Sequence, residues 1–446
     1  MTIKPELGAG FKDYLPQDAI PRQQMFATIQ RVFELFGYQP LTTPGIEREE
    51  ILTGGDPNFD KQIFRIAGQS GDKDLALRFD LTIPLARVIA AYPQEIKMPF
   101  KRYQVGSVWR AEKPQAGRFR EFTQFDADVV GAPGMMADAE IVAIMYAVMT
   151  ELGFGDRFKI RVNNRKILNG LAAYVGFASE LSPMVLRVID KMDKIGWEGV
   201  ARELSTATEE FAGFSPSQMT AIKSFLEIRA DGNSGILEAV ATLMANSKEA
   251  MQGVAELREI LDSLKALKVP DSAWVIDLSV ARGLGYYTGP VFETILTDIP
   301  ELGSVFSGGR YDDLVMRFSS NKVPATGASV GVDRIFAAME KLGLVRQQKS
   351  VAKVVVLNFD PTCSATVQGI VSNLRAAGLP SNLYLGQEKT LKGQLAYAVS
   401  QDVPVVVIVG ATENSSGVAQ VKDLKTRQQV EVPQSEIVAA VQKILT

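Results

Sequence analysis

Arginine, carboxylate and tyrosine side chains are available for chemistry in this sequence, and imidazole is not. The chain has 446 residues, among them 48 Lys and Arg, 51 Asp and Glu, one cysteine and no histidine. The lack of histidine excludes imidazole acid–base catalysis, histidine-activated nucleophiles and histidine-ligated zinc. The single cysteine, Cys363, excludes an intramolecular disulfide and a thiolate metal cluster. Chemistry must therefore use guanidinium, ammonium, carboxylate, hydroxyl, amide or backbone groups, or a hard cation such as Mg²⁺.

Two segments combine arginine with features that suit phosphate binding. Residues 108–113 (VWRAEK) open a predicted hairpin with a long tip, and residues 118–122 (RFREF) close it. Clustered Arg with one carboxylate suits a polyphosphate that carries a purine, although these residue types alone are better explained by a salt-bridged surface hairpin. Residues 327–334 (GASVGVDR) form a Gly-rich strand-to-helix junction with Arg in the first turn. It is not a Walker loop, and it is equally consistent with phosphate binding and with helix–sheet packing.

Two further segments combine glycine with tyrosine. They are residues 281–289 (ARGLGYYTG) and residues 307–312 (SGGRYD). Buried tyrosine hydroxyls need hydrogen-bond partners, so tyrosines beside one cleft could hold a polar ligand. Either segment alone is better explained as a tight turn with an aromatic side chain in the core.

Apolar spacing predicts the elements that position these segments. We expect a helix over 21–37, a proline-interrupted extended segment over 38–44 at an edge or interface, and a helix from about Thr82. Strands are predicted at 75–79, 100–110, 121–131, 275–279, 291–295 and 304–308, with a further helix from Val332. Helical spacing over about 165–270 indicates a helical insert.

The last hundred residues predict a small α/β domain with a mostly parallel, mixed sheet. Strands are expected at 351–358, 382–385, 405–409 and 418–424, and helices at 362–377, 391–399 and 435–445. The wholly apolar run 405–409 is typical of a central strand. We expect Cys363 to be structural, on an amphipathic helix.

The segments, taken together and in this order, resemble those of the class II aminoacyl-tRNA synthetases, specifically the histidyl-tRNA synthetase family. The matching segments are a motif 1 strand at Pro44, motif 2 and its continuation at 110–128, motif 3 at 331–334, the two signatures at 282–287 and 308–312, the amino-group-binding turn at 78–82, and the C-terminal segments 391–395 and 421–424. The resemblance covers nearly the whole chain and is weakest in the helical insert. Gly285 stands where many members carry Asp, and Asp80 and Asp128 where many bacterial members carry Glu.

The resemblance implies an α/β (α+β) fold with an antiparallel-sheet catalytic domain, a helical insert and a C-terminal α/β anticodon-binding domain. It implies that residues 1–165 form the first part of the catalytic core, with motifs 1 and 2. Residues 166–270 would then be the helical insertion, residues 271–346 the second part of the core, and residues 351–446 the anticodon-binding domain.

The resemblance also implies the reaction and the residues that perform it. L-histidine and ATP with Mg²⁺ would give histidyl-adenylate, and histidine would then pass to the 3′ end of tRNA(His). The implied roles are Arg110 at the α-phosphate, Glu112 at the adenine amino group, Arg118 at pyrophosphate, Arg334 at the γ-phosphate, Arg282 at the histidine carboxylate and α-phosphate, Asp80, Thr82 and Gln124 at the α-ammonium group, and Asp128, Tyr287 and Tyr311 at the imidazole. Arg282 and Arg110 would be catalytic, Pro44 would lie at a dimer interface, and no side chain is assigned to a metal.

The charge and hydropathy of the chain bear on its partners and location. The net charge of −3 gives no bulk attraction to nucleic acid, the N-terminus lacks a signal-peptide core, and no apolar run approaches a membrane span. We therefore expect a cytoplasmic protein with no membrane partner, and the resemblance implies a homodimer. The alternatives are a catalytically inactive regulatory subunit of ATP phosphoribosyltransferase, a module that binds tRNA without charging it, and a class II enzyme for another amino acid. We interpret the missing histidine as selected or engineered.

Overall fold

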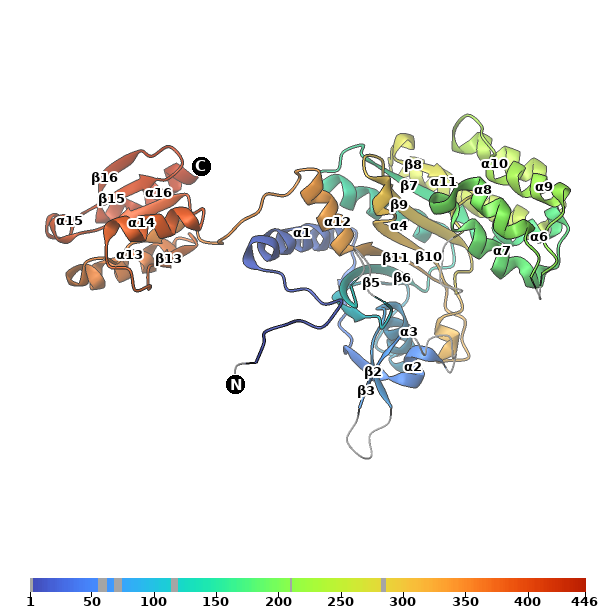
Figure 1. Cartoon of the computed structure of the whole chain (residues 1–446), viewed down its shortest axis with the longest axis horizontal. Helices are drawn as coiled ribbons and strands as arrows, with labels where there is room; N and C mark the ends of the chain where they lie inside the picture. The colour runs from blue at the N-terminus through green and yellow to red at the C-terminus, as the bar shows by residue number, and fades with distance from the viewer. Residues whose placement is uncertain (1–2, 55–61, 68–73, 114–118, 209–210, 282–285) are drawn as a thin grey trace. The chain divides into compact units, whose positions relative to one another are not determined.

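The computed structural model describes residues 3–54, 62–67, 74–113, 119–208, 211–281 and 286–446 (Figure 1). The chain divides into two compact units, Met1–Lys12 with Met25–Leu344, and Asp13–Gln24 with Val345–Thr446. The long helix α1 (Pro16–Leu35) begins five residues before the predicted start. Pro16 occupies its first position, where the missing backbone N–H costs nothing. The four-part domain division stays a prediction.

An eight-stranded sheet forms the centre of the first unit. Its strands, in spatial order, are β1 (Gln39–Pro40), β5 (Phe100–Trp109), β6 (Glu121–Val130), β11 (Ala325–Gly331), β10 (Phe306–Arg310), β9 (Pro290–Leu296), β7 (Phe158–Asn164) and β8 (Trp274–Ile276). Only the outermost pairings, β1 with β5 and β7 with β8, are parallel. Only residues 39–40 of the predicted extended segment 38–44 form a strand. This strand, β1, lies at the edge of the sheet.

One face of this sheet is apolar and covered by helices. The helices α4 (Met136–Glu151) and α12 (Val332–Lys341) contact β6 and β11. Phe33 near the end of α1 meets Phe125 of β6 edge-on, with ring centroids 5.2 Å apart. We predicted neither α4 nor β7. Most side chains along α4 are buried, so its apolar residues form no single stripe that would reveal a surface helix.

A three-stranded sheet stands beside the large one. It consists of β2 (Ile46–Arg48), β4 (Leu75–Leu77) and β3 (Phe64–Ile66), accompanied by α2 (Glu49–Thr53) and α3 (Thr82–Ala91). The predicted start of α3 at Thr82 is confirmed. The turn between β4 and α3 presents Asp80, whose Oδ1 accepts a hydrogen bond from the Ile83 backbone N–H at 3.1 Å.

Helices fill the predicted insert. They are α5 (Arg165–Asn169), α6 (Leu171–Val175), α7 (Ser182–Ile189), α8 (Met192–Ser205), α9 (Pro216–Leu226), α10 (Gly232–Leu243) and α11 (Lys248–Ala266). Arg161 of β7 pairs with Asp193 of α8 at 2.7 Å and with Glu293 of β9 at 2.5 Å. This buried guanidinium joins the helical insert to the large sheet.

The second unit holds a mixed five-stranded sheet. The strand order is β13 (Ser381–Leu383), β12 (Val354–Val356), β14 (Val405–Ile408), β15 (Val418–Asp423) and β16 (Gln429–Pro433), with helices α13 (Ser364–Ala376), α14 (Leu391–Ser400), α15 (Ala411–Ser416) and α16 (Ile437–Leu445). The unpredicted β16 makes half of the pairings antiparallel, so "mostly parallel" was wrong. The apolar run does form a central strand, since β14 is buried on both faces. Cys363 is buried at the end of a 3₁₀ turn, just before α13.

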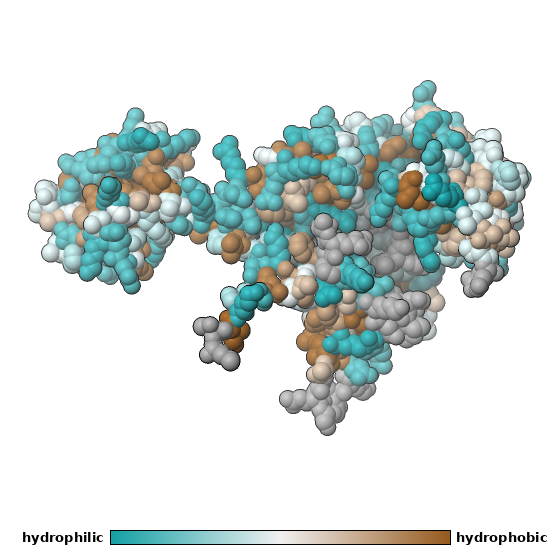
Figure 2. Space-filling model, in the orientation of Figure 1, coloured by the Kyte–Doolittle hydropathy of each residue, from teal (hydrophilic) through white to brown (hydrophobic). Residues whose placement is uncertain are grey.

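Short 3₁₀ turns complete the described chain: η2 (Ser179–Leu181), η3 (Asp271–Ala273), η4 (Pro300–Leu302), η5 (Val315–Arg317), η6 (Pro361–Cys363) and η7 (Gln434–Glu436). Within the described ranges, no helix combines the length and apolarity required to span a membrane. In the view of Figure 2, hydrophilic residues cover most of the surface of each unit.

Candidate active site

Two adjoining cavities open over the polar face of the large sheet. The basic cavity, with a volume of about 240 Å³, is lined by Arg110, Lys113 and Arg334, among others. The acidic cavity, of about 280 Å³, is lined by three carboxyl groups, Asp80, Asp126 and Asp128, and by three tyrosines, Tyr286, Tyr287 and Tyr311. Both cavities include Arg110, Gln124, Ser307 and Ser329 in their walls. A ligand in one cavity would therefore meet a ligand in the other at these shared residues.

Strand alternation places the polar side chains of the acidic cavity on one face. Gln124, Asp126 and Asp128 occupy alternate positions of β6, with Phe125 and Ala127 between them on the apolar face. Their cross-strand neighbours on this face are also polar or small: Gly331, Ser329 and Gly327 on β11, and Gly106, Gln104 and Arg102 on β5. The sequence period of two thus builds a binding surface and a core from the same strand.

Glycines leave room for the functional side chains. A Cβ atom at Gly327 would lie 2.0 Å from Oδ1 of Asp128, and a Cβ at Gly309 would lie 3.1 Å from the Tyr287 ring. Any side chain at Gly327 would therefore displace the carboxylate. The Gly-rich segments noted in the sequence serve close approach of side chains across neighbouring strands.

Asp128 is held by two buried neighbours. Nη2 of Arg102 lies 2.7 Å from Asp128 Oδ2, and the Tyr311 hydroxyl donates a hydrogen bond to Oδ1. Arg102 is fully buried and Asp128 is 3% exposed. Burial raises the pKa of Asp128, while the Arg102 charge and the Tyr311 hydroxyl oppose that rise. The carboxylate is fixed in orientation and faces the cavity.

Acceptor atoms without partners lie in the same cavity. Among the described residues, Oδ2 of Asp80, Oδ1 of Asp126 and Oε1 of Gln124 are buried and have no hydrogen-bond partner. Burial raises the pKa of Asp80 to about 6 and that of Asp126 to about 7. Unpaired buried acceptors are costly, so a ligand that donates hydrogen bonds or carries positive charge would stabilise them.

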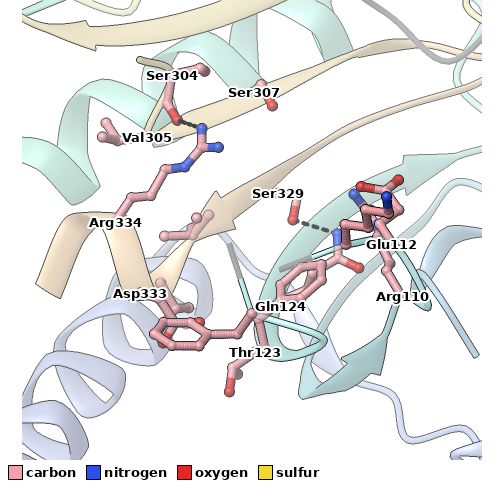
Figure 3. A pocket seen from close by; sticks show the side chains of 16 residues that line it. Arg110, Glu112, Thr123, Gln124, Ser304, Val305, Ser307, Ser329, Asp333 and Arg334 are labelled. Carbon is pink, nitrogen blue, oxygen red and sulfur yellow. Dashed lines mark hydrogen bonds between the residues drawn. The ribbon is translucent and has the colours of Figure 1, made fainter. Parts of the chain in front are cut away.

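Arginines of the basic cavity are anchored through part of their guanidinium groups. Nη1 of Arg334, in the first turn of α12, donates to the Ser304 carbonyl oxygen at 2.7 Å (Figure 3). Nε of Arg110 donates to the Phe79 carbonyl oxygen at 3.3 Å, and its guanidinium carbon lies 5.0 Å from the Phe122 ring centroid. Figure 3 shows the two arginines entering from different elements. Such fixed, separated positive charges suit a polyphosphate.

Three tyrosines in edge-on contact line the acidic cavity. The rings of Tyr286 and Tyr287 meet edge-on with centroids 5.0 Å apart, and Tyr286 and Tyr311 do so at 6.0 Å. Burial raises the pKa of all three hydroxyls, so they stay protonated and can donate hydrogen bonds. The cavity therefore combines aromatic walls with hydroxyl donors and carboxylate acceptors.

Sequence comparison decides the family. Residues 10–335 match the family model described as histidyl-tRNA synthetase, and residues 353–444 match the model of an anticodon-binding domain. The chain belongs to the histidyl-tRNA synthetase family. It is accordingly an aminoacyl-tRNA ligase, and the predicted activity, ATP-dependent attachment of histidine to tRNA, is confirmed.

Members of this family from several bacteria align over nearly the full chain. The histidine–tRNA ligase of Wolinella succinogenes is 41% identical over 425 residues, which is 95% of this chain and 94% of that protein. That of Paracoccus denitrificans is 40% identical over 484 aligned positions, covering 99% of this chain and 98% of that protein. The crystal structure of the histidyl-tRNA synthetase from a Nostoc species superposes with a TM-score of 0.88 at 33% identity, covering 99% and 100% of the two chains.

A second structural likeness bears on the regulatory alternative. A Bacillus halodurans protein titled ATP phosphoribosyltransferase regulatory subunit/histidyl-tRNA synthetase has a TM-score of 0.74 and 22% identity, covering 89% of this chain and 97% of that one. At this identity only the fold is shared, so the likeness gives no support to a regulatory function. The predicted fold class, with its antiparallel sheet and C-terminal anticodon-binding domain, is confirmed.

Most residues predicted from the histidyl-tRNA synthetase motifs come together at the two cavities. Asp80, Thr82, Gln124, Asp128, Tyr287 and Tyr311 line the acidic cavity, while Glu112 and Arg334 line the basic one and Arg110 lines both. Pro44 is absent from both described linings, and its carbonyl oxygen accepts a hydrogen bond from Arg78 Nη1 at 3.2 Å. Arg118 and Arg282, with Gly285, lie outside the described residues. The roles of all these residues stay predictions.

Sequence reasoning missed several residues of the site. Asp126, Tyr286, Ser307 and Ser329 line the acidic cavity, and Arg102 pairs with Asp128 behind it. The alternation of β6 could have revealed Asp126, since it stands midway between Gln124 and Asp128. Arg102 and Ser329 depend on cross-strand register, which one sequence does not specify.

Proposed function

We propose that the acidic cavity binds L-histidine, that the basic cavity binds ATP, and that histidyl-adenylate forms where they meet. The observation that carries this proposal is the pair of adjoining cavities of opposite charge, with Arg110 in both linings. An amino acid carboxylate and an α-phosphate repel each other, so the reaction requires positioning and fixed positive charge more than proton transfer. An active site of arginine, carboxylate and tyrosine meets this requirement without any histidine.

The histidine α-ammonium group would lie against Asp80, Thr82 and Gln124. Its three N–H donors suit the unpaired oxygens of Asp80 and Gln124. The imidazole would lie between Asp128 and Tyr287, with Tyr311 orienting the Asp128 carboxylate. A ligand that lacks the ring nitrogens would leave these buried polar groups unpaired, which discriminates strongly.

ATP would be held by charges placed along its phosphates. Arg110 would hold the α-phosphate, Arg334 the γ-phosphate, and Glu112 the adenine amino group. Arg118 and Arg282 keep the roles implied by the family motifs, at pyrophosphate and at the histidine carboxylate. Arg110 and Arg282 would be the catalytic residues, because by the family motifs both would contact the reacting α-phosphate.

Mg²⁺ would be bound mainly by the ATP phosphates. Within the described ranges, no group of three or more acidic or thiol side chains could hold a metal ion. Magnesium in nucleotide sites is commonly held by one or two carboxylates together with phosphates, and Glu112 and Asp333 line the basic cavity. The ion would screen phosphate charge, while the arginines of the chain orient the nucleotide.

The remaining partners follow from tRNA charging. The adenylate phosphate would accept the proton from the tRNA(His) ribose hydroxyl, so no histidine of the protein is required. The C-terminal unit would bind the anticodon. We propose a cytoplasmic homodimer in which the segment around Pro44 lies at the interface, as motif 1 implies.

Amino-acid-dependent ATP–pyrophosphate exchange tests this assignment. Each of the twenty standard amino acids is supplied in turn to the full-length protein, and only L-histidine is expected to support exchange. Exchange with no amino acid would refute the proposed activation step, whereas exchange with another one would refute the specificity alone. The Arg282→Ala variant should keep its thermal unfolding midpoint and lose exchange. Near-normal exchange would remove Arg282 from the site.

A further inference from the structure

Asp126 is a buried carboxyl group of the acidic cavity to which the proposed function gives no role. It is 2% exposed, and among the described residues its Oδ1 has no hydrogen-bond partner. It occupies the position between Gln124 and Asp128 on the polar face of β6 and lies opposite Gln104 and Ser329. A carboxyl group with this placement can reach a ligand that already contacts both of its neighbours on the strand.

Charged groups of both signs surround Asp126. The groups that face it or act on its charge are Arg102 and Gln104 on β5, Gln124 and Asp128 on β6, Ser329 on β11, Asp80 and Arg78 near the start of α3, and Tyr286 and Tyr287. Arg102 already pairs with Asp128 at 2.7 Å. Arg110, the cation in the described lining, also borders the basic cavity. Among the described residues, Asp126 therefore has no ion-pair partner of its own.

Histidine can bring a positive charge to this carboxyl group in a way that other amino acids of similar size cannot. Its α-ammonium group offsets one carboxylate. Its imidazole, with an ordinary pKa of about 6.5, can bring a further proton near neutral pH. The amides of asparagine and glutamine bring none. A second carboxylate beside Asp128 gives each ring nitrogen an acceptor, and each nitrogen donates only when the ring carries both protons.

Resting on the proposed histidine site, we infer that Asp126 is a specificity-determining residue that, together with Asp128, binds the imidazole with one shared proton. In the complex that proton lies between the ring and the pair of carboxyl groups. Above neutral pH the Asp126 carboxyl group and the imidazole of free histidine are both mostly unprotonated, so the proton is taken up from solvent on binding. Tyr311 and Arg102 keep Asp128 in place, while Asp126 supplies the additional negative charge.

Isothermal titration of L-histidine into the full-length wild-type protein measures this proton. Titrations at pH 8.0 in two buffers with different ionisation enthalpies give the number of protons taken up. With a pKa of about 7 for Asp126 and about 6.5 for imidazole, we expect close to one. Uptake by the α-ammonium group is the same in wild type and Asp126→Asn, so their difference isolates the shared proton. Binding of histidine by the wild type without uptake would overturn the inference, whatever the variant does.

The pH dependence of the Michaelis constant provides the second readout. In pyrophosphate exchange, the wild-type KM for histidine should rise roughly 10-fold between pH 7.0 and 8.5, and that of Asp126→Asn less than about 2-fold. The KM for ATP should depend on pH equally in both proteins. Asp138→Asn is the matched control, because Asp138 is a buried carboxyl group on the apolar side of the sheet, paired with Arg310. It should keep the wild-type profile.

The outcomes separate this inference from the function on which it rests. Parallel pH profiles for wild type and Asp126→Asn would show that Asp126 only supports the structure, and the inference would fail. A wild-type protein that activates no histidine would instead refute the proposed function. A protein that activates histidine with a flat profile would retain that function and overturn the inference.

Discussion

Replacing Tyr311 by phenylalanine isolates one hydrogen bond in the acidic cavity. The Tyr311 hydroxyl donates to Asp128 Oδ1, and both side chains are buried, at 3% exposure each. The substitution removes the hydroxyl and keeps the ring that packs edge-on against Tyr286. Asp128 would then be held by Arg102 alone, and its pKa would rise further, because one of the groups that lower it is lost.

The magnitude follows from the strength of a hydrogen bond to a charged group. Such a bond contributes about 1.5–3 kcal/mol, and the free energy of unfolding of Tyr311→Phe should fall by this amount. The same energy limits the effect on histidine recognition. We therefore expect kcat/KM for histidine to fall between roughly 10-fold and 150-fold, with little change in the KM for ATP.

Pyrophosphate exchange at varied histidine and ATP concentrations measures both constants, and urea denaturation measures stability. Tyr103→Phe is the matched control. Its hydroxyl donates to Glu34 Oε1 at 2.8 Å, and Tyr103 alternates with Arg102 and Gln104 on β5, so it faces away from the cavities. It should leave the KM for histidine unchanged. A Tyr311→Phe protein with wild-type kcat/KM for histidine would show that Asp128 needs no support from the hydroxyl, contrary to the proposed geometry.

Three other substitutions probe the remaining parts of the site and its support. Gly327→Ala should abolish histidine-dependent exchange with the fold retained, since its Cβ would fall 2.0 Å from Asp128 Oδ1; full activity at saturating histidine would contradict this. Arg310→Met should lower the free energy of unfolding by about 3–5 kcal/mol in urea, because it leaves buried Asp138 unpaired; a loss below 1 kcal/mol would count against the pair. Arg334→Ala should raise the KM for ATP at least roughly 10-fold and leave the KM for histidine unchanged. The reverse pattern would show that the basic cavity binds histidine and the acidic cavity binds ATP.

Local patterns predicted the elements of this fold more completely than their pairing. The alternation in β6 and the apolar run in β14 were sufficient to predict strands, because one strand has a face in the core and the other is buried on both faces. Helix α4 was not predicted because it is buried on most sides and lacks a single apolar stripe. The strand β16 was not predicted because most of its side chains are exposed, so its sequence shows no apolar pattern typical of a buried strand.

The same distinction holds for the candidate site. Residues within a motif, such as Gln124 and Asp128, were found because they stand in a continuous segment that resembles motif 2 of the family and its continuation. Arg102 lies opposite Asp128 only through the register of β5 with β6, and Ser329 reaches the site only through the register of β11 with β6. Long-range pairings of this kind depend on the whole sheet, and a single sequence specifies them weakly.

The two-residue period of β6 has a consequence for how this protein can change over time. Its side chains alternate between the acidic cavity and the apolar core. Loss or gain of one residue within β6 would turn Phe125 and Ala127 toward the ligand and force Asp126 and Asp128 into the hydrocarbon interior. Evolution can therefore adjust substrate choice here by replacing residues, whereas any change of length in this strand would destroy recognition and folding in one event.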